Sequence, residues 1–127
     1  MSATDDIVSG IMAKWAENFS RFDADGQASL YSKNALFYGS KPVLYRGRDG
    51  VASYFNGLAK WRSREVTFTD VVTVPAGNDV INVAGIANFV IDEGVTNLSV
   101  KITWVIVRED GDWKIVSHHV SFRGALI

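Results

Sequence analysis

The part of the chain that decides the fold reads Thr103-Trp104-Val105-Ile106-Val107-Arg108-Glu109-Asp110-Gly111-Asp112-Trp113-Lys114-Ile115-Val116-Ser117-His118-His119-Val120-Ser121. Two runs rich in β-branched and aromatic residues flank an Asp-Gly turn, which predicts a long β-hairpin. Both histidines of the protein lie side by side in the second run. Because neighbouring strand residues point to opposite faces, at most one of them can face a pocket on this sheet.

The rest of the second half is also predicted to form strands, and the first half is predicted to be mainly helical. The strands are expected at Val66–Val74, Val80–Ile91, Leu98–Val107 and Trp113–Phe122, between turn-forming segments. Apolar residues recur at helical spacing from Ile7 to Phe19, behind a Thr4 N-cap, and again from Val51 to Trp61. Between these two helical segments we expect a short helix, Asp25–Ser32, followed by two short strands, Ala35–Tyr38 and Val43–Tyr45. Helices followed by an antiparallel meander indicate an α+β protein.

Length and composition favour one domain, residues 1–127, with a core of its own: 47% of the residues are hydrophobic. The net charge of −1 gives no basic excess for nucleic acid or an anionic membrane surface. The chain has no Cys, and its two His residues lack a clustered carboxylate, so no metal site is expected. No phosphate-binding glycine loop is present, and no cofactor is expected. Without a basic leader or an apolar run of roughly 18 residues, the expected location is the cytoplasm.

The strand Leu98–Val107 is apolar on both of its faces. Helices can cover one face of the sheet, and a second copy of the protein is the simplest cover for the other. We therefore expect a homodimer, with Ile102, Trp104 and Ile106 at or near the contact.

The order of these elements resembles the nuclear transport factor 2-like fold, and most closely its SnoaL-like branch. The resemblance is carried by Trp15, Phe19, Leu30-Tyr31, Ala35-Leu36-Phe37-Tyr38, Gly47-Arg48-Asp49-Gly50-Val51, Thr103-Trp104 and Trp113-Lys114-Ile115-Val116 with His119 and Ser121. The last segment is also similar to the association domain of calcium/calmodulin-dependent kinase. The resemblance implies a cone-shaped α+β fold, with three N-terminal helices packed on a curved, mainly antiparallel sheet. It does not imply one function, because this fold hosts isomerases, dehydratases, epoxide hydrolases, polyketide cyclases and non-catalytic assembly domains.

Ketosteroid isomerases with this fold place a Tyr on the first helix, an Asp base on the first strand and a protonated Asp on the long strand. The matching positions in this chain hold Trp15, Gly39 and Thr103. Ketosteroid isomerisation by that machinery is therefore not expected, and whether the protein is an enzyme at all stays open. Tyr31 matches a Tyr of the isomerase pocket, whereas Phe55 stands where another Tyr would be.

The predicted site is a pocket between the helices and the concave face of the sheet. If Thr103 faces this pocket, Lys101 and Val105 do so as well. The same matching places Val116, His118 and Val120 inward and His119 outward, although a β-bulge would exchange these positions.

His118 is the candidate catalytic residue, as a general acid or base near neutral pH. The alternative is a partly buried structural His. The other candidate ligand-binding residues are mostly aromatic, and core packing alone would also explain their spacing: Trp15, Phe19, Tyr31, Tyr38, Tyr54, Phe55, Trp61 and Asn88.

Two functions are compatible with these residues. The first is a SnoaL-like protein that binds a small hydrophobic or aromatic molecule, with lyase or isomerase acid–base chemistry as an extension. The second is a non-catalytic ligand-binding or assembly module. An ionisable group that projects into the cavity would favour the first, and the sequence does not identify the ligand.

Overall fold

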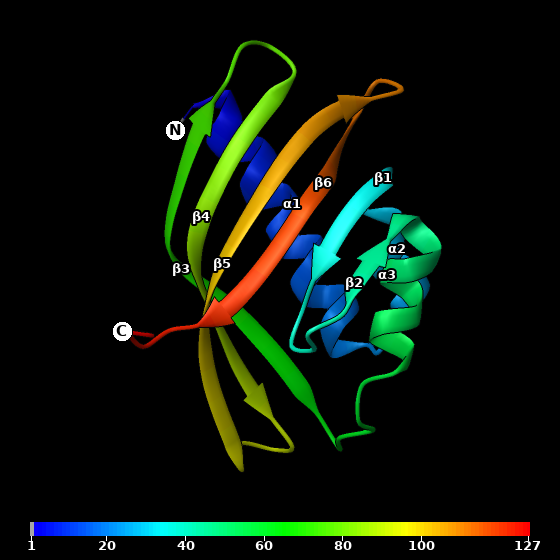
Figure 1. Ribbon diagram of the computed structural model, residues 1–127, viewed down its shortest axis with the longest axis vertical. Coiled ribbons are helices and arrows are strands. Elements are labelled where there is room, and N and C mark those ends of the chain that lie inside the picture. Colours follow the sequence, from blue (N-terminus) through cyan, green and yellow to red (C-terminus); the bar gives the residue numbers. More distant parts are fainter. Residues whose placement is uncertain (1) are drawn as a thin grey trace.

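The structure is a computed structural model that describes residues 2–127. Within this range, three helices pack on one six-stranded sheet with the strand order β2-β1-β6-β5-β4-β3 (Figure 1). The helices are α1 (Ala3–Ser20), α2 (Ala24–Ser29) and α3 (Gly47–Asn56). The strands are β1 (Tyr31–Tyr38), β2 (Leu44–Arg46), β3 (Arg64–Pro75), β4 (Val80–Ile91), β5 (Thr96–Glu109) and β6 (Asp112–Phe122). The α+β class is confirmed.

The helices differ from the prediction in four respects, the first of which is that α3 ends at Asn56, before Leu58 and Trp61. In contrast to what the resemblance implied, the helices are not all N-terminal, because β1 and β2 precede α3, where the residue pattern placed two short strands. The N-cap of α1 is Ser2 rather than Thr4, and the Ser2 hydroxyl accepts a hydrogen bond from the backbone N–H of Asp5. Helix α2 ends at Ser29, earlier than predicted, because Tyr31 already belongs to β1.

The sheet is mixed and curved, and α1 runs across one of its faces (Figure 1). Neighbouring strands are antiparallel except for β1 and β6, which run parallel. The predicted hairpin is present: β5 and β6 are joined at Asp110 and Gly111, whose φ angles of 52° and 83° are those of a tight hairpin turn.

The core-facing side of β5 carries Ile102, Trp104 and Ile106, all of which are buried within the protein. Lys101, Thr103 and Val105 alternate with them and therefore point to the opposite face of the sheet. Two predictions are thus wrong: the first three residues do not form a dimer contact, and the last three do not face the pocket. The helices cover the face of β5 that carries the larger apolar residues, and Thr103 lies on the opposite face.

A β-bulge in β6 explains the arrangement of the second hairpin strand. Val105 pairs with Ser117, but its neighbour Ile106 pairs with Ile115, so Val116 is the extra residue. The bulge lets Ile115 and His118 both point into the protein. The predicted inward position of Val116 is therefore not observed, whereas the exposed His119 lies outward as predicted.

In the part of the chain that the structure describes, no helix is both long and apolar enough to cross a membrane. Nor do any three His, Cys, Asp or Glu side chains within residues 2–127 lie together as metal ligands would.

Candidate functional site

A cavity of about 320 Å³ lies between α1, α3 and the concave face of the sheet. Ligand sites range from roughly 300 to 1,000 Å³, so this cavity suits a small molecule. Trp15, Ile102 and His118 belong to the buried part of its lining, which we call the floor. Leu98 and Phe122 are 51% and 68% exposed and lie at its mouth. Among the described residues that line it, none is Lys, Arg, Asp or Glu.

Three neighbouring strands place His118 at the floor of the cavity. His118 pairs with Phe37 of β1 on one side and with Trp104 of β5 on the other. Its imidazole stacks on the Phe37 ring, with 3.9 Å between centroids and 16° between planes. The side chain is 4% exposed. Packing by both neighbours thus fixes the position of the ring.

A short chain of buried hydrogen bonds ends on the Nδ1 atom of His118. The Trp15 indole N–H donates to the Tyr31 hydroxyl over 3.0 Å, and this hydroxyl lies 2.8 Å from Nδ1. The Trp104 indole N–H donates to the same Nδ1 atom over 2.9 Å. Tyr31 and Trp104 therefore hold the imidazole from one side.

Burial governs the charge of this site. Burial, with a smaller contribution from the nearby His119, lowers the pKa of His118 from 6.5 to about 3, so the imidazole is neutral at physiological pH. Burial also raises the pKa of Tyr31, because the phenolate would be desolvated. The site therefore offers uncharged hydrogen-bonding groups rather than ions.

Seven of the predicted site residues are brought together around the cavity: Trp15, Phe19, Tyr54, Phe55, Trp61, His118 and Val120. Tyr31 is fully buried and bonds to His118 without lining the cavity. Tyr38 is 43% exposed and lies beside His119 on the outer face. Asn88 also lies outside the lining and is bonded to Thr69 and Ser99.

The sequence prediction missed the lining residues that β4 and β5 supply, including Phe89, Val100 and Ile102. The strict alternation of apolar residues from Leu98 to Ile106 was the signal that could have identified those on β5.

Gly39 lines the cavity at the position matched to the isomerase base. A Cβ atom there would lie 2.4 Å from the Tyr54 ring. The Tyr54 hydroxyl accepts a hydrogen bond of 2.9 Å from the Ser40 backbone N–H. Tyr54 therefore fills the space next to Gly39 that a carboxylate side chain would need.

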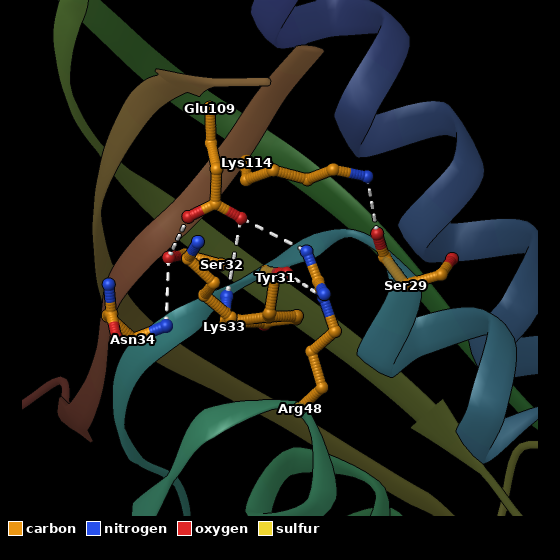
Figure 2. A network of polar contacts seen from close by, with 8 residues as sticks. All are labelled: Ser29, Tyr31, Ser32, Lys33, Asn34, Arg48, Glu109 and Lys114. Carbon is orange, nitrogen blue, oxygen red and sulfur yellow. Dashed lines mark hydrogen bonds and ion pairs between the residues drawn. The ribbon is translucent and has the colours of Figure 1, made fainter. Parts of the chain in front are cut away.

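A second polar cluster lies at the start of β1, outside the cavity lining (Figure 2). Glu109 accepts hydrogen bonds from the Ser32 hydroxyl at 2.6 Å and from Arg48 at 3.0 Å. The bond from Ser32, with help from Arg48, holds the pKa of Glu109 below its usual value. Arg48 Nε also donates to the Tyr31 carbonyl at 2.9 Å, as Figure 2 shows. This cluster thus fixes the backbone of the residue whose hydroxyl contacts His118.

Comparison with known protein families gives a match over residues 8–124 to the model described as the SnoaL-like domain. No curated protein matches the chain.

Several solved structures share the fold. A provisionally named calcium/calmodulin-dependent protein kinase II association domain from Xanthomonas campestris is 19% identical, with a TM-score of 0.80; the match covers 90% of this chain and 84% of that one. A provisionally assigned scytalone dehydratase from Novosphingobium aromaticivorans is 13% identical, with a TM-score of 0.81 and coverage of 93% and 84%. An NTF2-like protein with a cystatin-like fold from the same organism is 14% identical, with a TM-score of 0.81 and coverage of 97% and 84%. At these identities the likeness shows the fold alone.

Proposed function

Because the chain belongs to the SnoaL-like domain family, as the sequence resemblance indicated, we propose that it binds a small, uncharged, largely apolar molecule in its cavity. The observation that carries this proposal is the composition of the lining. Aromatic side chains from α1, β1, α3 and β4 face the cavity, and no described lining residue carries a formal charge at physiological pH. A charged ligand would lose its hydration without gaining a counter-ion, whereas an aromatic ring would replace water on apolar surface.

Lyase or isomerase chemistry is the catalytic extension of this proposal. His118 is its candidate residue, and the other polar side-chain groups in the described lining are the hydroxyls of Ser40, Tyr54 and Ser121 and the indole N–H groups of Trp15 and Trp61. With its pKa lowered to about 3, His118 is suited to hydrogen bonding rather than to proton transfer near neutral pH. Binding is therefore the part of the function that the site supports best.

Isothermal titration with three ligands of similar shape tests the binding proposal. We expect naphthalene to bind more tightly than 1-naphthoate and 1-naphthylmethylammonium, because the described lining supplies no counter-ion for either charge. Failure of naphthalene to bind, or tighter binding of either ion, would contradict the proposal.

We also propose that residues 1–127 form one cone-shaped domain that pairs as a homodimer through the outer face of the sheet. Exposed apolar residues support this surface: Val72 is 60% exposed and Val74 is 54% exposed. Lys101, Thr103 and Val105 lie on the same face. Sedimentation at micromolar concentration should give twice the chain mass of 14.0 kDa, and a monomer would rule the pairing out. The cytoplasmic location stays a prediction.

A further inference from the structure

The hydrogen bonds at Nδ1 of His118 determine where its ring carries a proton. An indole N–H can only donate, so Nδ1 must accept the bond from Trp104. The Tyr31 hydroxyl already accepts from Trp15, which leaves its own proton free to donate to Nδ1. Two donors from two different elements therefore converge on one acceptor atom.

A neutral imidazole that accepts at Nδ1 carries its proton on Nε2. The opposite tautomer would place an N–H group against the two donors from Tyr31 and Trp104. Turning the ring over would remove Nδ1 from both hydrogen bonds, and the stack on Phe37 limits intermediate orientations. The contacts around the ring thus select one tautomer and one orientation.

The Nε2 atom itself has no hydrogen-bond partner among the described residues. In that part of the chain, Gln27 Oε1 is the one fully shielded side-chain polar atom that lacks a partner. Nε2 is therefore not shielded, and the cavity that the ring lines is the space it can reach. A polar group on a residue that is only 4% exposed is thus directed at a largely apolar cavity.

We propose that His118 selects the ligand through Nε2–H, as a fixed donor to one uncharged acceptor oxygen on an otherwise apolar molecule. This inference rests on the proposed binding function and names the group that the ligand presents. A ligand without an acceptor would cover Nε2–H and leave it unpaired, which is unfavourable in an apolar site. A carboxylate would accept the bond, but the described lining supplies no cation to offset its charge.

The first test requires no variant. Long-range ¹H–¹⁵N correlation spectra of the native protein at pH 7 distinguish the protonated ring nitrogen from the one that holds a lone pair. We expect the proton of His118 on Nε2. A proton on Nδ1, or fast exchange between the two tautomers, would overturn the proposal.

The second test compares two ligands of nearly the same shape, 2-acetylnaphthalene and its alkene analogue 2-isopropenylnaphthalene. The native protein should bind the ketone roughly 3–10-fold more tightly than the alkene, because one neutral hydrogen bond strengthens binding by about this factor. His118→Leu should abolish this preference while it still binds the alkene. The matched variant His119→Leu, on the outer face, should keep the preference.

The outcomes separate this inference from the function on which it rests. Equal binding of ketone and alkene by the native protein would leave the binding function in place and overturn the role of His118. Failure of both ligands to bind would contradict the binding function, and the proposed ligand class with it. Preference for the ketone that survives His118→Leu would assign the donor to another residue and overturn the inference.

Discussion

The imidazole of His118 is buried in its neutral form, and this links the stability of the protein to pH. Its pKa is lowered from 6.5 to about 3 by desolvation, with a contribution from His119. Between these two values the unfolded chain binds a proton that the folded protein does not bind. Stability is therefore complete above about pH 6.5 and falls with pH in this window, by about 1.4 kcal/mol per pH unit.

Urea unfolding between pH 4.5 and 7.5 should show this loss in the native protein. The side-chain carbonyl of Asn in His118→Asn can still accept from Tyr31 and Trp104. In this variant the slope of the free energy of unfolding against pH should be smaller, by the amount that corresponds to about one bound proton. The control His119→Asn, on the exposed outer face, should keep the native slope. If the free energy of unfolding depends on pH in the same way in the native protein and in His118→Asn, the imidazole of His118 is not buried in its neutral form.

The Tyr31 hydroxyl connects Trp15 to His118, and its removal leaves the Trp15 N–H without its partner. Tyr31→Phe should therefore lower the free energy of unfolding by about 1–3 kcal/mol. Tyr38→Phe is the matched control, since Tyr38 is 43% exposed and should change stability by less than about 0.5 kcal/mol. Chemical denaturation monitored by circular dichroism measures both. Equal effects would mean that the buried hydrogen bond has no special role.

Helices, strands and turns were largely predictable, because each depends on residues close together in the sequence. Strand β4 was predicted with its observed bounds, and the Asp110-Gly111 turn adopts the predicted hairpin. The faces of the hairpin strands were not predictable in the same way. One extra residue, Val116, shifts the phase of β6, and nothing local in the sequence distinguishes a bulged strand from a regular one.

Two glycines in different elements should respond to Ala in opposite directions. Gly111 has a φ of 83° in the hairpin turn, so Gly111→Ala should lower the free energy of unfolding by about 1 kcal/mol or more. Gly10 lies inside α1, and a Cβ there would meet nothing within 4 Å. Gly10→Ala should therefore stabilise the protein by roughly 0.5–1 kcal/mol. Thermal unfolding of both variants checks this, and a stabilising Gly111→Ala would contradict the turn geometry.

In the whole molecule, the cavity joins residues that lie far apart in the sequence, from Trp15 on α1 to Phe122 at the end of β6. Aromatic side chains could be proposed for its wall from their helical spacing alone. Which residues of β5 face it, and which atom of His118 is left free, depends on the strand register and on contacts between elements. The strand register and the contacts of His118 depend on how the strands pair and how the sheet packs against α1, so they could not be predicted from the sequence pattern.

Val100 and Lys101 are neighbours on β5 that point to opposite faces, and Val100 lines the cavity. Isothermal titration of naphthalene into the native protein, Val100→Trp and Lys101→Trp therefore tests most directly whether the cavity is the binding site. The native protein and Lys101→Trp should bind alike, whereas the indole in Val100→Trp should fill the cavity and reduce binding at least tenfold. Equal binding by both variants, with the fold intact by circular dichroism, would show that the ligand site lies elsewhere.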